Sequence, residues 1–151
     1  MNLQMEINSL KQRIAELEGQ VEQEKEFPQD GDVYWYINPL GFTFHDEWSG
    51  FVSEGHKIEI GNVFKTRDQA EFAVEKLKVE AELRKFSRPF ESMEDNFSMV
   101  LDTSNGSLDI WCRLYSNCQG TIYFESEEKA QQAIESVGEE RIKKYIFEVE
   151  E

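Results

Sequence analysis

The stretch VFKTRDQA at residues 63–70 has a counterpart in YFESEEKA at residues 123–130. Each runs from a strand-like pair to a charged residue, a hydroxyl side chain suited to a helix N-cap, and an alanine four positions later. The match continues into Ala73-Val74 and Ala133-Ile134. It predicts two similar units in one antiparallel sheet with helices on one face. A match this short also arises when two unrelated helices share a cap pattern, and the sequence leaves both explanations open.

Each half of the sequence supplies the strands that such a unit needs. In the first half we expect a hairpin with a strand at 33–37, a turn at 38–41 and a return strand that begins at 42–44. A loop around Trp48, Gly50 and Gly55 follows. An extended segment at 58–64 then leads into a helix at about 67–85. In the second we expect strands at 97–101 and 108–115 around an Asn-Gly turn at 104–106, a loop at 116–120, a lead-in at 121–124, a helix at 127–137 and a short amphipathic segment at 141–147.

The N-terminal region has a heptad pattern. The apolar residues alternate in spacing between four and three, and they are Leu3, Ile7, Leu10, Ile14, Leu17 and Val21. β-Branched residues at a with leucine at d favour two strands if the helices are parallel. Self-association of this helix is one interpretation, and folding back onto its own domain is the other. Phe27-Pro28 and Gly31 end the helix.

These patterns predict an α+β fold: an antiparallel sheet built from two similar strand-strand-helix halves, plus an N-terminal coiled-coil helix. Residues 1–27 form the oligomerisation helix and residues 31–148 the ligand-binding domain. The helix expected at 67–85 has two apolar stripes, where a surface helix needs one. The first consists of Ala70, Ala73, Val74, Leu77 and Ala81, and the second of Phe72, Val79, Leu83 and Phe86. Together with the heptads, the second stripe predicts a dimer or a larger homo-oligomer.

The charge of the chain is one-sided. Its 151 residues carry 31 acids and 16 bases, a formal net charge of −15, which argues against duplex nucleic acid and acidic membranes as partners. The polar, periodic N-terminus does not read as a secretory signal, and no apolar run is long enough to span a membrane. We therefore expect a cytoplasmic protein.

The sequence has no recognisable catalytic pattern. It lacks a glycine-rich phosphate loop, a GxSxG motif and a CxxC pair, and His45 and His56 have no metal-ligand spacing. We expect no catalysis, no metal and no cofactor, and a reduced pair of thiols at Cys112 and Cys118.

Basic and aromatic residues gather in one region. Residues 66–90 carry six bases and five acids, and Arg113 is the only base between residues 91 and 125. Arg113 either forms an ion pair with a nearby carboxylate or binds a phosphate. The oxygens of a phosphate match the geometry of the guanidinium N–H donors. The bases near the helix end suit either a phosphate or simply the helix dipole. The candidate ligand-binding residues are Arg67, Arg84, Phe86, Arg88, Asn96, Trp111 and Arg113.

Residues 62–66, 69–79 and 81–84, together with Ile122–Ser126, resemble the first class of phage Thoeris anti-defence proteins. That family sequesters the cyclic ADP-ribose isomers made by bacterial TIR-domain enzymes, and some members also bind cyclic di- or trinucleotides. The resemblance covers roughly residues 30–148. It implies that Phe86, Asn96 and Arg113 match the aromatic, amide and arginine with which the family contacts its ligand, in pockets at subunit junctions.

The resemblance thus implies a phage sponge that acts in the cytoplasm of the infected bacterium. It would bind glycocyclic ADP-ribose without degrading it, with Arg113 and nearby bases at the pyrophosphate and Phe86 at the adenine. The alternative is an acidic phage protein that mimics DNA and blocks a host defence nuclease by direct contact. In that case Arg113 would be an ordinary ion-pair residue.

Overall fold

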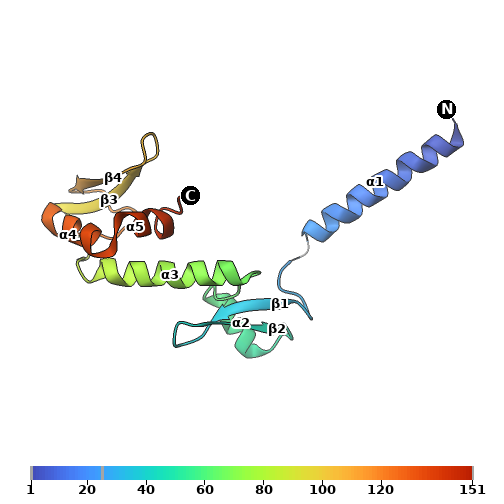
Figure 1. Ribbon diagram of the computed structural model, residues 1–151, viewed down its shortest axis with the longest axis horizontal. Coiled ribbons are helices and arrows are strands. Elements are labelled where there is room, and N and C mark those ends of the chain that lie inside the picture. Colours follow the sequence, from blue (N-terminus) through green and yellow to red (C-terminus); the bar gives the residue numbers. More distant parts are fainter. Residues whose placement is uncertain (1, 25, 151) are drawn as a thin grey trace. The chain divides into compact units, whose positions relative to one another are not determined.

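The computed structural model describes residues 2–24 and 26–150, apart from the side chains of residues 22–24. Figure 1 shows the elements in chain order. They are α1 (Leu3–Glu24), β1 (Val33–Ile37), β2 (Thr43–Glu47), α2 (Val52–Glu59), α3 (Arg67–Arg84), β3 (Asn96–Asp102), β4 (Ser107–Arg113), α4 (Glu127–Val137) and α5 (Glu139–Tyr145). The class is α+β, as expected. The extended lead-in expected from residue 58 is wrong at its start, because α2 continues to Glu59.

The two halves share one local plan. Each has an antiparallel hairpin, β1–β2 or β3–β4. In each, a single antiparallel bridge then joins the first strand to the aromatic residue that precedes the next helix: Trp35 to Phe64, and Phe97 to Phe124. The helix begins three residues after that aromatic, at Arg67 or at Glu127. The predicted repeat is therefore present, but in the described residues each hairpin forms its own two-stranded sheet rather than half of a shared one.

The chain divides into two compact units. The first comprises Met1–Tyr36 and Phe44–Thr66, and the second comprises Ile37–Thr43 and Arg67–Glu151. The segment 31–148, expected to be one domain, is thus shared between both units.

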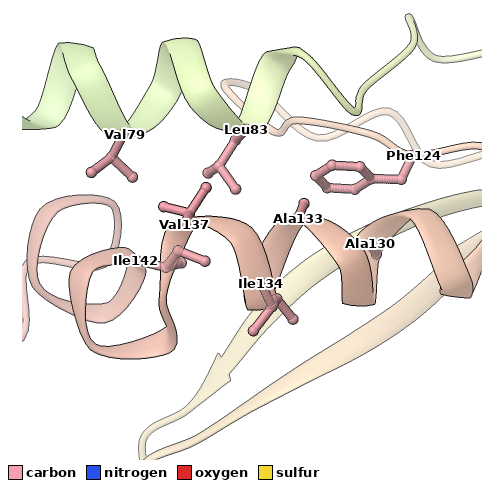
Figure 2. Packing of buried hydrophobic residues seen from close by; sticks show 8 residues of the cluster. All are labelled: Val79, Leu83, Phe124, Ala130, Ala133, Ile134, Val137 and Ile142. Atoms are coloured by element: carbon pink, nitrogen blue, oxygen red, sulfur yellow. The ribbon is translucent and has the colours of Figure 1, made fainter.

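The main hydrophobic core lies in the second unit. There α4 lies between α3 and the β3–β4 hairpin, and α5 packs against α3 and α4 (Figure 1). The core residues come from α3, α4, α5 and the segment before α4, and they are Val79, Leu83, Phe124, Ala130, Ala133, Ile134, Val137 and Ile142 (Figure 2). Ser126 caps α4 by accepting a hydrogen bond from the backbone N–H of Lys129 at 3.1 Å, as its position predicted.

The two apolar stripes expected on α3 are only partly correct. The buried residues of this helix are Ala70, Val74, Val79 and Leu83, which mixes members of both stripes. Leu77, expected in the first stripe, is 57% exposed. Leu77 therefore remains available at the surface, while the residues that contact α4 and α5 come mainly from the second stripe.

A bidentate ion pair connects α5 to α3. Arg141 donates from Nη1 to Glu82 Oε2 at 3.0 Å and from Nη2 to Glu82 Oε1 at 3.1 Å. The hydrogen bond from Arg141 holds the pKa of the Glu82 carboxyl below its usual value, and the same bond raises the pKa of Arg141. Arg141 is thus a structural arginine with a defined partner.

The first unit has a small core around Tyr34, which is fully buried between Tyr36 and Trp48. Lys57 donates to the Tyr34 hydroxyl at 3.0 Å, and its Nζ lies 3.8 Å from the centre of the Tyr36 ring. Burial raises the pKa of the Tyr34 phenol. Glu54 is also buried, and its Oε1 accepts hydrogen bonds from the backbone N–H groups of Phe51 and Ser49.

The helix α1 contacts solvent along its whole apolar seam. The exposed fractions of its six residues range from 38% at Ile7 to 71% at Leu3. The apolar seam consists of Leu3, Ile7, Leu10, Ile14, Leu17 and Val21. The heptad positions thus lie on one continuous helix, and its apolar face is exposed to solvent. No helix in the described ranges is both long and apolar enough to cross a membrane.

Candidate ligand-binding site

The candidate site lies on one face of the β3–β4 hairpin. In the antiparallel register Trp111 lies opposite Ser98, and Arg113 lies opposite Asn96. Residues two apart on a strand point to the same face. The alternate residues of β4, Leu108 and Ile110, pack against the hydrophobic core. Trp111 and Arg113 therefore lie on the face that points away from the core.

Arg113 makes a cation–π contact with its neighbour. Its guanidinium carbon lies 5.8 Å from the centre of the Trp111 ring, and the Trp111 residue is 51% exposed. Within the part of the chain that the structure describes, no carboxylate oxygen lies within 4.0 Å of this guanidinium. The ion pair that sequence reasoning left open for Arg113 is thus not formed among these residues.

The candidate Asn96 is buried below the loop that leads into β3. Its Nδ2 donates to the carbonyl oxygens of Glu91, Glu94 and Arg113 at 2.8, 2.8 and 3.0 Å. Its Oδ1 accepts from the backbone N–H of Glu91 and from Arg88 Nη1, both at 2.9 Å. Asn96 therefore ties this loop to the end of β4. The ligand contact predicted for it would have to replace one of these bonds, and it stays a prediction.

Arg88 has a full set of partners beside Asn96. Besides the bond to Asn96, its Nη1 donates to the carbonyl oxygen of Pro89 at 3.0 Å and its Nη2 to that of Asp95 at 2.6 Å. Its backbone N–H also donates to the carbonyl of Tyr123. The structure thus brings three candidates together at one end of the hairpin, where Arg88 and Asn96 support the strand that carries Arg113.

The remaining candidates lie elsewhere in the second unit. Phe86 is partly buried against the hydrophobic core, and so it is not part of the face that carries Arg113. Arg84 is exposed at the last turn of α3. Arg67 begins the same helix, about 25 Å from Arg84 along its axis, and forms a 2.7 Å ion pair with Glu71. Arg67 and Arg84 of one chain are therefore too far apart to contact the same small ligand.

Sequence reasoning missed the exposed apolar residues around Arg113. Leu114 is 41% exposed and Tyr115 is 71% exposed. Met93, 72% exposed, donates its backbone N–H to the carbonyl of Leu114 at 2.9 Å and has a left-handed φ of 74°. We call Met93, Trp111, Arg113, Leu114 and Tyr115 the Arg113 surface. The sequence signal for this surface was the apolar pair Leu114 and Tyr115, which directly follows Arg113 at the end of β4.

The second unit also has open pockets, and their linings differ from the Arg113 surface. One of about 470 Å³ has an aromatic and acidic lining with three carboxylates against one lysine; the residues are Phe42, Phe72 and Tyr145, with Asp68, Glu71, Glu75 and Lys144. Such a lining would repel a phosphate. A smaller one of about 210 Å³ is mainly apolar and reaches Leu83 and Phe147. In the described ranges, no group of three His, Cys, Asp or Glu side chains could hold a metal ion.

Comparison with known protein families, with curated proteins and with solved structures gives no match for this chain.

Proposed function

We propose that this protein is a stoichiometric binder of a small anionic nucleotide, and that the ligand is a glycocyclic ADP-ribose. The observation that carries this proposal is Arg113. It is an arginine on an exposed strand face of an acidic protein, stacked beside an aromatic ring and without a carboxylate partner in the described residues. A guanidinium in that situation suits a pyrophosphate, which accepts two parallel hydrogen bonds from it.

The neighbouring side chains suit the rest of such a ligand. Trp111 offers a ring face beside the guanidinium, on which an adenine can stack. The bonds that Arg88 and Asn96 make hold the loop and the end of β4 in place. A supported strand keeps Arg113 ready before the ligand arrives, which lowers the entropic cost of binding.

The Arg113 surface is open in a single chain, whereas small-molecule sites usually bury most of their ligand. We infer that a second copy of the chain covers the ligand and that this copy supplies further contacts, Phe86 among them. A sponge that outcompetes an immune effector needs nanomolar affinity, about 12 kcal/mol. Enclosure serves that aim because excluding water strengthens each charged hydrogen bond.

In this proposal the protein performs no catalysis and acts in the cytoplasm of an infected bacterium, where it withholds the signal of a TIR-domain enzyme from its effector. The rival is an acidic inhibitor that contacts a nuclease directly. The net charge of −15 is consistent with such an inhibitor. That function, however, does not explain why Arg113 lies beside the exposed ring of Trp111.

The test is capture followed by release. The pure protein is mixed with the product of a TIR-domain enzyme, separated from unbound nucleotide by filtration, and denatured by heat. We expect the intact nucleotide to disappear from the filtrate and to return after heating. Recovery of hydrolysed nucleotide would indicate an enzyme, and a filtrate that keeps all its nucleotide would favour the inhibitor. The Arg141→Ala variant is a matched control, because that arginine lies in a structural ion pair.

A further inference from the structure

The apolar seam of α1 is a surface that needs a partner. Its six side chains are all exposed, as described above. They occupy the a positions Ile7, Ile14 and Val21 and the d positions Leu3, Leu10 and Leu17 of a continuous helix. Exposure of so much apolar surface on one stripe is unfavourable in water, and a matching stripe on another helix is the simplest cover.

The charges that flank this seam identify the partner. The g positions include Glu6 and Arg13, and the e positions include Lys11 and Glu18. In a parallel, in-register pair each g residue faces the e residue five positions later on the other helix. Glu6 then faces Lys11 and Arg13 faces Glu18, and symmetry repeats both attractive pairs on the other side of the coil.

The antiparallel arrangement has the opposite electrostatics. Full overlap of the apolar seam would place residue 3 beside residue 21 of the second helix. Positions g then meet g and positions e meet e, so that Arg13 faces Arg13 and Lys11 faces Lys11. Like charges at these flanking positions disfavour that pairing.

The residues of the seam itself indicate two strands. β-Branched side chains at every a position, with leucine at every d position, favour the parallel dimer over trimers and tetramers. Arg13 also donates to Glu16 of its own helix at 3.1 Å. This bond leaves other donors of the guanidinium for Glu18 of the second copy, because arginine carries five N–H groups.

We propose that α1 forms a parallel, in-register, two-stranded coiled coil with a second copy of this chain, selected by the pairs Glu6–Lys11 and Arg13–Glu18. This inference is independent of the nucleotide proposal, since it depends on α1 alone. The coil is about 33 Å long. A parallel coil places both linkers after Phe27-Pro28 at the same end, and so it holds two copies of the rest of the chain close together.

Cross-linking of the full chain tests the orientation. In a Cys112→Ser/Cys118→Ser background, Leu3→Cys and Val21→Cys are made as separate variants, each checked by circular dichroism and then oxidised alone and as a mixture. We expect each variant alone to give a covalent dimer, because residue 3 meets residue 3 and residue 21 meets residue 21. Cross-links that form only in the mixture would show an antiparallel coil, and their absence from all three samples would exclude the coil. Either result overturns the proposal.

Strand number is tested by the double variant Leu3→Cys/Val21→Cys in the same background. In a two-stranded coil both disulfides join the same two chains, and a denaturing gel shows covalent dimers alone. In a three-stranded coil the two ends can link different neighbours, and covalent trimers accumulate. Covalent trimers would overturn the two-stranded assignment.

Charge reversal tests the selecting pairs, with the cross-link yield of Leu3→Cys as the readout. We expect Glu6→Lys/Glu18→Lys and Lys11→Glu/Arg13→Glu each to weaken self-pairing at least tenfold, and a mixture of the two to restore it. The control Asn8→Lys/Gln12→Lys adds charge outside the e and g positions and should pair like the parent. If both reversed variants pair like the parent, the charges do not select the partner and the proposal fails.

Discussion

Two arginines of the second unit differ in what their guanidinium groups contact. Arg141 binds both oxygens of Glu82, whereas Arg113 lies over the ring of Trp111. The sequence showed that Arg113 was a single base among acids, but it could not show which of these situations Arg113 occupies. Ion pairing depends on the register of β3 and β4 and on the loop above them, and these are properties of the folded chain.

We predict that Arg113→Ala weakens ligand binding about 30- to 1,000-fold, equivalent to about 2–4 kcal/mol, because a buried arginine–phosphate fork is lost. Its melting temperature should stay close to that of the parent. Arg141→Ala should do the reverse and lose about 0.5–1 kcal/mol of stability while keeping its affinity. Isothermal calorimetry and thermal unfolding of both variants decide the matter. Unchanged affinity with lowered stability in Arg113→Ala would make Arg113 a structural residue.

Glu54 should make the stability of the first unit sensitive to acid. Burial raises the pKa of this carboxyl. Hydrogen bonds from the backbone N–H groups of Phe51 and Ser49 and from the hydroxyl of Tyr34 lower it by more, so the pKa of Glu54 lies below its ordinary value of 4.5. A group whose pKa is depressed by folding stabilises the fold above its unfolded pKa. That contribution is lost as the pH falls from about 4.5 through the folded value.

We therefore predict that Glu54→Gln lowers stability at pH 7 and makes it fall less steeply between pH 5 and pH 3. Denaturant titrations followed by tryptophan fluorescence measure both effects, because Trp48 packs against Tyr34 in this unit. Parallel acid profiles for Glu54→Gln and the parent would contradict this role of Glu54.

At the scale of elements, hairpins and capped helices were predictable because their signals are local. The Asn-Gly turn placed β3 and β4 on either side, and the hydroxyl at Ser126 placed the start of α4. The helix α2 was missed, since its sequence VSEGHKIE contains a glycine and lacks a buried stripe; Glu54 is its one buried residue. Its signal was Glu54 itself, whose carboxylate accepts backbone N–H bonds at the start of the helix.

Glycines in different elements should respond oppositely to alanine. Gly19 lies at an f position of α1 and an added Cβ meets nothing within 4 Å, whereas Gly106 holds the β3–β4 turn with φ of 75°. We predict that Gly19→Ala stabilises the helix by about 0.8–1 kcal/mol per chain. Gly106→Ala should destabilise its hairpin, because alanine disfavours a left-handed φ. Thermal unfolding followed by far-ultraviolet circular dichroism measures both, and a loss of helix stability in Gly19→Ala would contradict this description of α1.

At the scale of the whole molecule, the sequence predicted the α+β class and the repeat, but not the division into units. A single shared sheet was expected because both halves carry strands of similar length. In the structure Phe64 and Phe124 each contribute one bridge rather than a third strand, so each sheet stays small. How far a lead-in segment pairs depends on packing between distant parts of the chain, and local patterns do not encode it.

Light scattering at micromolar concentration should give a mass of at least twice 17.7 kDa. The exposed seam of α1 is the reason, and removal of residues 1–26 should weaken assembly without abolishing nucleotide capture. The same two samples, compared by filtration with nucleotide, check the second half of this prediction. A full chain that is monomeric at these concentrations would contradict both the coil and the covered ligand site.

We propose that the folded protein holds an intact nucleotide. The most direct measurement is a calorimetric titration of the full chain with purified glycocyclic ADP-ribose. We predict saturable binding with a nanomolar Kd, at a fixed ratio of ligand to protein chains, and recovery of unchanged ligand after heat denaturation. If protein that circular dichroism shows to be folded binds no glycocyclic ADP-ribose, it is not a binder of this nucleotide.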